Sequence, residues 1–206
     1  MHRDVFAQWS PGPSNPRAAE SQVDVWRIDL APPARRYPDP IAHRAVARAA
    51  MRDLLGRYLE RPAEMLALSL QPGGKPFLDL PIKFNLSHCA DTALLAVTPT
   101  AEVGVDVERL REVGDPLRLA GRALTADELA QLSDAPADRQ LELFFDLWTR
   151  MEARQKAFGR GIFAGRVDPG EVSSFGFRPS PLHFASLAVC LPHTSLSLRF
   201  FDYAGP

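Results

Sequence analysis

The segment EVGVDVERL, residues Glu102–Leu110, constrains the fold of this chain more than any other feature of the sequence. Positions 103, 105 and 107 are all valine and point to one side of a strand, whereas Asp106 and Glu108 point to the other side. The valine side needs an apolar layer to pack against. The chain must therefore contain a sheet with one dry face and one face that presents paired carboxylates.

Other segments supply the partners of this strand. Runs rich in β-branched, aromatic and aliphatic residues predict strands, and apolar residues at a spacing of three to four predict helices. A mixture in which a strand and helices are followed by further strands favours an α+β fold over a doubly wound one. The expected strands are Val23–Leu30, 82–87, 92–98, Glu102–Leu110 and short runs between Val172 and Tyr203; the expected helices are Ile41–Leu59, Leu117–Ala123, Ala126–Leu132 and Gln140–Phe158.

The 206 residues suffice for one domain or two small ones. Residues 1–22 are rich in proline, glycine and serine and predict a loose N-terminal leader. We expect an N-terminal half over residues 23–100 and a C-terminal half over residues 101–206, joined near Thr98–Glu102.

Composition excludes several classes of protein. A net charge of −1 and a pI near 6.5 give no basic field for nucleic acid. No apolar run approaches the ~20 residues of a membrane span, and the N-terminus lacks the apolar core of a signal peptide. Cys89 and Cys190 lack the spacing of a zinc site and are interpreted as buried free thiols. We expect a cytoplasmic protein with no nucleic-acid or membrane partner.

The carboxylates of Asp106 and Glu108 lie two residues apart on one strand face. Two such groups repel each other unless a cation lies between them, and hard oxygen ligands suit Mg²⁺. The alternative interpretation is an amphipathic edge strand whose polar face is solvated.

A second group lies in WTRMEARQKAFGRG, residues 148–161, within the last predicted helix. Trp148, Glu152 and Lys156 follow one another at intervals of four and share a helical face. An ordinary stabilising Glu–Lys pair would explain two of them. A tryptophan on the same face instead indicates a partly apolar setting, which can tune a base and hold a phosphate.

Cations recur at separate points of the sequence. Lys75 follows two glycines on a predicted turn, where its amine could reach an anion, and Arg44 and Arg48 share one side of the 41–59 helix. His88 ends a strand after Ser87, a place where a structural role is the commoner one. Together with a Mg²⁺ site and one base, these residues fit attack at a phosphate or pyrophosphate, where catalysis is positioning plus charge neutralisation.

Four motifs in series resemble the Sfp-type 4′-phosphopantetheinyl transferases. They read Gly74-Lys75-Pro76, Phe84-Asn85-Leu86-Ser87-His88, Gly104-Val105-Asp106-Val107-Glu108 and the 148–161 segment. The match covers about residues 41–165. The resemblance implies two similar helix-plus-antiparallel-sheet halves related by a pseudo-twofold, with coenzyme A as the substrate in the cleft between them.

The resemblance also implies an activity, that of a holo-[acyl-carrier-protein] synthase type of transferase. It would move 4′-phosphopantetheine from coenzyme A to a serine of an apo acyl or peptidyl carrier protein and release 3′,5′-ADP. Asp106, Glu108 and Glu152 would bind Mg²⁺ with the pyrophosphate, and Glu152, or a water it orients, would deprotonate the serine. The carriers of fatty-acid, polyketide and nonribosomal peptide biosynthesis are all candidates, and a monomer is expected.

The same resemblance implies a coenzyme A site. Ser87, His88 and Lys156 would contact coenzyme A, the last two at its pyrophosphate. Lys75 and an arginine of the 41–59 helix, either Arg44 or Arg48, would contact the 3′-phosphate, where a charge-assisted pair selects coenzyme A over its dephospho form.

The sequence departs from the family pattern at Met151, where the family has a lysine. A catalytically weak carrier-binding relative is therefore one alternative, and an unrelated Mg²⁺-dependent phosphohydrolase is another. Glu128 matches a position where the family often has Glu, but a capping box with Thr125 explains it without any function.

Overall fold

The computed structural model of the chain describes residues 5–30, 40–160, 167, 170, 172–190 and 196–205. The described strands form two main sheets and a two-stranded ribbon. The first sheet has the order β1-β10-β2-β6-β5, and the second has the order β7-β9-β8. The strands are β1 (Ser10–Pro11), β2 (Gln22–Asp29), β5 (Lys83–Cys89), β6 (Thr92–Thr98), β7 (Val103–Arg109), β8 (Ser173–Ser180), β9 (His183–Val189) and β10 (Ser197–Asp202), with β3 (Ser69–Leu70) and β4 (Pro76–Phe77) in the ribbon.

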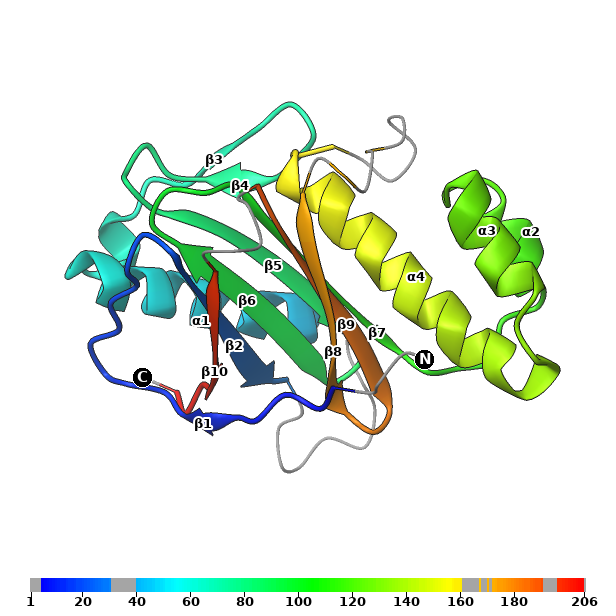
Figure 1. Ribbon diagram of the computed structural model, residues 1–206. Helices are drawn as coiled ribbons and strands as arrows, with labels where there is room; N and C mark the ends of the chain where they lie inside the picture. The colour runs from blue at the N-terminus through cyan, green and yellow to red at the C-terminus, as the bar shows by residue number, and fades with distance from the viewer. Residues whose placement is uncertain are drawn as a thin grey trace.

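The helices lie outside the two sheets (Figure 1). They are α1 (Pro40–Leu59), the 3₁₀ turn η1 (Ala63–Met65), α2 (Pro116–Ala120), α3 (Ala126–Ser133) and α4 (Ala137–Ala157). None of the described helices is long and apolar enough to cross a bilayer. The predicted α+β class is confirmed, and the element boundaries fall close to the predicted ones, except that α2 ends at Ala120 before Gly121.

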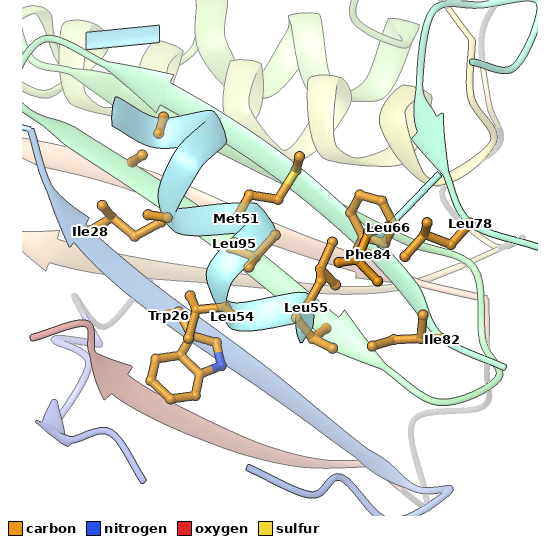
Figure 2. Packing of buried hydrophobic residues seen from close by; sticks show 14 of the residues in the cluster. Trp26, Ile28, Met51, Leu54, Leu55, Leu66, Leu78, Ile82, Phe84 and Leu95 are labelled. Atoms are coloured by element: carbon orange, nitrogen blue, oxygen red, sulfur yellow. The ribbon is translucent and has the colours of Figure 1, made fainter. Parts of the chain in front are cut away.

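Buried apolar residues form a core on each face of the first sheet. Figure 2 shows one of them, where Met51, Leu54 and Leu55 of α1 lie over Trp26 and Leu95. The opposite face contributes residues of β2 and β6 that pack on the valines of β7 and on β9. The layers are therefore α1, first sheet, second sheet and α4. Not every apolar residue of α1 faces this core, since Val46 is 45% exposed on the outer side of the helix.

The two halves repeat one topology. In the first, β2 is followed by α1 and then by the hairpin β5–β6, and β6 lies between β5 and β2. In the second, β7 is followed by α2–α4 and then by the hairpin β8–β9, and β9 lies between β8 and β7. All four pairings are antiparallel. The expected similarity of the halves is thus present in their strand order.

Two segments cross the predicted divisions of the chain. Strand β10, late in the sequence, pairs in parallel with β2 and so joins the first sheet. The predicted loose leader is not loose over its described part: β1 pairs with β10, and the backbone N–H of Ala7 donates to the carbonyl of Arg178 at 3.2 Å. Its prolines prevent a long strand but leave enough donors for these short pairings.

Candidate functional site

Strand β7 and helix α4 build the site. The valines of β7 are buried against the first sheet, and its other face lies under α4. A Cβ at Gly104 would lie 2.1 Å from the carbonyl oxygen of Ala153, so only glycine allows α4 to come this close. Asp106 is 2% exposed. The alternative of a solvated polar face is therefore wrong, because a helix covers that face.

Three carboxylates meet at this crossing. One oxygen from each of Asp106, Glu108 and Glu152 lies within 4.8 Å of the others. Oδ2 of Asp106 is buried and accepts no hydrogen bond from any residue that the structure describes. An orphaned buried oxygen beside two more carboxylates is costly unless a cation occupies the centre. These residues, which we call the acidic cluster, fit Mg²⁺, which takes carboxylate oxygens and completes its shell with water or phosphate.

Lys156 stands beside the acidic cluster. Its ammonium donates to Oδ1 of Asp106 at 2.5 Å and to Oγ of Ser87 at 3.0 Å, and it lies 3.5 Å from Glu152. Ser87 also donates to Oδ1 of Asp106 at 2.9 Å. Burial alone would lower the pKa of Lys156, but the charges of Asp106 and Glu152 raise it, so the side chain stays a cation. The structure thus brings Ser87, Lys156 and the carboxylates together.

Glu152 has a second fixed contact. The indole N–H of Trp148 donates to its Oε1 at 2.7 Å, as expected for residues on one helical face. Burial and the negative charge of Asp106 raise the pKa of Glu152 to about 7, although Lys156 and the indole bond act in the opposite direction. A carboxylate with a pKa near neutrality can accept a proton during a reaction and return it.

His88 follows Ser87 on β5 and lies among cations. Burial and the positive charges of Arg44 and Lys156 lower the pKa of His88, and His43 and Arg48 add to the effect. The first turns of α1 and the last turn of α4 therefore both approach β5 near His88. Arg44 and Arg48 are both exposed. Arg52, on the same side of α1, instead donates to the carbonyl of Leu66 at 2.7 Å.

The amine of Lys75 does not project freely from its turn, contrary to the sequence-based interpretation. The turn itself is present, with Gly74 at φ +83°. However, the side chain is buried, and the ammonium donates to Glu102, to the carbonyl of Val103 and to the carbonyl of Ala157. The turn is pressed against the end of α4, which local sequence cannot reveal.

Sequence reasoning missed Asn85 as a functional position. Its Oδ1 accepts the backbone N–H of Val105 at 2.8 Å, which attaches β7 to β5. The available signal was its place between Phe84 and Leu86 on a strand, two residues before Ser87, because a buried asparagine needs a partner. Cys89 and Cys190 are only partly buried, and the thiol of Cys89 contacts Oε2 of Glu108 at 3.6 Å.

Met151 does not face the acidic cluster. It is 3% exposed and packs with residues of α2 and α3 and with Phe184. Arg150 does not replace the missing lysine, because it pairs with Asp146 at 3.1 Å one turn away. For Glu128, the capping box with Thr125 is confirmed, and its Oε1 also accepts from Arg154 at 2.6 Å, which fastens α3 to α4.

A cavity of about 690 Å³ lies elsewhere, lined by Arg139, Asp146 and Arg150 of α4 together with Phe177 and Phe184. At 100° per residue these α4 positions lie opposite the side that carries Glu152. This cavity is therefore separate from the chemistry described above.

The comparisons with known proteins agree with this geometry. A sequence model of the 4′-phosphopantetheinyl transferase superfamily matches residues 102–202, the segment from the start of β7 to the end of β10. A relative that is 30% identical aligns over most of the chain. The chain therefore belongs to the 4′-phosphopantetheinyl transferase superfamily and is an enzyme of this class.

Three relatives illustrate the match. The 4′-phosphopantetheinyl transferase HetI of Nostoc sp. is 30% identical over 202 residues, covering 86% of this chain and 84% of the relative. The 4′-phosphopantetheinyl transferase AcpT of Escherichia coli K12 is 33% identical, with 78% and 83% covered. The 4′-phosphopantetheinyl transferase psf-1 of Bacillus pumilus is 38% identical, with 56% and 53% covered.

Proposed function

We propose that this enzyme transfers 4′-phosphopantetheine from coenzyme A to a serine of an apo acyl or peptidyl carrier protein, depends on Mg²⁺ and releases 3′,5′-ADP. The observation that carries the proposal is the acidic cluster beside Lys156, in a chain that belongs to this superfamily. A pure carrier-binding relative would have no use for three converging carboxylates whose mutual repulsion weakens the fold.

Asp106, Glu108 and Glu152 would hold the metal ion, and Oδ2 of Asp106 is a buried oxygen to which no described residue donates a hydrogen bond. When bound, Mg²⁺ supplies charge neutralisation at the pyrophosphate of coenzyme A and orients it for displacement. Lys156 and His88 would contact the same pyrophosphate, with Ser87 holding the Lys156 ammonium in place. Arg44 or Arg48, both exposed on α1 beside His88, would bind the 3′-phosphate.

Glu152 would act as the base. It would take the proton of the carrier serine, directly or through a water, as the serine oxygen bonds to the β-phosphorus. The bond between that phosphorus and the bridging oxygen breaks, and 3′,5′-ADP leaves with the bonding electrons. Trp148 keeps one oxygen of Glu152 fixed during this transfer.

The test is incubation of the purified protein with an apo carrier protein, coenzyme A and Mg²⁺, followed by intact mass spectrometry of the carrier. We expect a mass gain of one phosphopantetheine that EDTA abolishes and that a carrier lacking the acceptor serine does not show. Release of nucleotide or phosphate without an acceptor would indicate a phosphohydrolase. Binding of coenzyme A without transfer to any of several carriers would indicate the catalytically weak relative.

We also propose that the enzyme works as a monomer, because α1, β5, β7 and α4 of one chain supply every proposed member of the site. Sedimentation at working concentration tests this. The cytoplasmic location, and the absence of nucleic-acid and membrane partners, remain predictions from composition.

A further inference from the structure

Lys75 lies where the β3–β4 ribbon meets the end of α4. Its side chain is 6% exposed. A Cβ at Gly73 would lie 1.7 Å from the carbonyl oxygen of Gly159, and Gly159 itself adopts φ +64°. The two glycines therefore allow a contact between backbones that no larger residue permits. From this point of contact, the side chain of Lys75 extends into the interior of the protein.

The ammonium of Lys75 has three donors, and the structure gives each an acceptor. It donates to Oε2 of Glu102 at 2.9 Å, to the carbonyl of Val103 at 2.9 Å and to the carbonyl of Ala157 at 3.1 Å. A lysine has three N–H donors and no acceptor. A phosphate would have to displace one of these partners and leave a carbonyl or carboxylate without a donor, which is costly in a buried place.

The acceptors belong to the two elements that carry the acidic cluster. Val103 is the first residue of β7, three residues before Asp106. Ala157 is the last residue of α4, and its carbonyl is one of those that a helix end leaves without an internal partner. A cation at this negative end of the helix is favourable. One ammonium therefore fastens the start of β7 to the end of α4.

We infer that Lys75 is a positioning residue that holds β7 against α4, and that it is not a contact for the 3′-phosphate of coenzyme A. The inference rests on the proposed function, since it concerns the metal held between the two elements. Fixing their ends sets the distance from Asp106 and Glu108 on β7 to Glu152 on α4. Loss of the ammonium loosens the acidic cluster without touching coenzyme A.

The experiment measures two affinities of Lys75→Met. Mn²⁺ binding is followed by electron paramagnetic resonance in the absence of coenzyme A, and the affinities for coenzyme A and dephospho-coenzyme A are measured by calorimetry. We expect Mn²⁺ affinity to fall about tenfold, as for other residues that support metal ligands. The ratio of the coenzyme A affinity to the dephospho-coenzyme A affinity should stay at the wild-type value. A collapsed ratio with unchanged Mn²⁺ affinity would overturn the inference.

Matched variants make the result specific. Lys83 also pairs with Glu102, at 3.0 Å, but it is 37% exposed, so Lys83→Met should change neither affinity. Arg44→Gln and Arg48→Gln supply the positive control, since at least one should lower the ratio. Thermal unfolding of each variant reports whether the fold survives.

Glu102→Gln decides the matter even if Lys75→Met does not fold. This variant replaces the ion pair between Glu102 and Lys75 by a weaker hydrogen bond, so it should lower the Mn²⁺ affinity by a smaller factor than Lys75→Met does. If Lys75 were instead a phosphate contact, the same variant would free its ammonium from Glu102, and the affinity for coenzyme A would rise. A wild-type chain that binds no Mn²⁺ contradicts the proposed function and this inference together, whereas equal Mn²⁺ binding by wild type and all Lys75 and Glu102 variants overturns this inference alone.

Discussion

The two halves place a buried aspartate on their first strand, yet the two aspartates have opposite surroundings. Asp24 on β2 is fully buried and both its oxygens are satisfied, by Tyr58 of α1 at 2.5 Å and by Arg199 at 2.7 and 2.9 Å. Asp106 on β7 accepts hydrogen bonds from Ser87 and Lys156, and both bonds go to the same oxygen, Oδ1. A carboxylate with both oxygens paired holds a fold together, and one with an oxygen to spare can bind a ligand.

The difference extends along both strands. The residues of β2 that face α1 after Asp24 are Trp26 and Ile28, part of an apolar core. The corresponding side of β7 carries two carboxylates and meets a third on α4. One topology thus supplies stability in the first half and a charged site in the second. Four predictions test this contrast, from the largest expected effect to the smallest.

Glu152→Gln should remove most of the transfer activity while the second half of the protein stays folded. The amide can neither take the serine proton nor neutralise a cation, so transfer should fall about a thousandfold, or ~4 kcal/mol in the barrier. The rate constant at saturating carrier and coenzyme A measures the loss. Glu142→Gln, on the same helix and paired with Arg139, is the control and should behave as wild type. A loss below tenfold in Glu152→Gln would contradict its role as base.

The pair Asp24→Asn and Asp106→Asn compares the two aspartates directly. Asp24→Asn removes the charge partner of Arg199 and should lower the free energy of unfolding by about 3 kcal/mol, since breaking a buried pair is costly. Asp106→Asn should cost much less, because its amide oxygen can still accept from Ser87 and Lys156, but it should abolish Mn²⁺ binding. Urea unfolding and Mn²⁺ titration separate the two outcomes. Equal stability losses would mean that both aspartates are structural.

The stability of the metal-free protein should depend on pH through Glu152. Its folded pKa of about 7 lies above its ordinary value of 4.5, so the folded protein holds this proton at pH values where the unfolded chain has lost it. The free energy of unfolding should therefore fall as pH rises from about 4.5 to about 7, by at most ~3 kcal/mol. Urea unfolding in EDTA across this range measures it. In Glu152→Gln this fall should disappear; parallel curves for the two proteins would refute the assignment.

Met151→Lys should not restore a missing function. Met151 is enclosed by the α2–α3 side of α4, so a lysine there would have to desolvate its charge or leave the core. We expect a loss of about 2 kcal/mol in the free energy of unfolding and no gain in transfer. Met151→Leu keeps the volume and is the control. Faster transfer by Met151→Lys at unchanged stability would instead support the weak-relative alternative.

Sequence patterns predicted what depends on local periodicity. The alternation of β7 placed Asp106 and Glu108 on one face, and the four-residue spacing on α4 placed Trp148, Glu152 and Lys156 together; the structure shows both. The patterns could not predict where an amine goes once the chain folds. The turn of Lys75 was read correctly, but its three acceptors come from residues 102, 103 and 157, and no local rule joins them.

Long-range pairing escaped prediction for the same reason. Nothing in Ser197–Asp202 distinguishes a strand of the second sheet from one of the first, because an alternating strand fits any apolar face. Strand β10 therefore appeared to belong to the later half, although it pairs with β2. The described part of residues 1–22 could not be placed either, since its partners lie near residues 178 and 202.

The pairing of β10 with β2 has a consequence for how the protein is made. During synthesis the ribosome delivers β2, α1, β5 and β6 long before residue 202 emerges, so the first sheet waits with one edge of β2 open and Asp24 lacking Arg199. Domains often fold in the order of their synthesis. Here the first sheet can be completed only after β10 has been synthesised, and an intermediate without β10 exposes an edge of β2 that can pair with other chains.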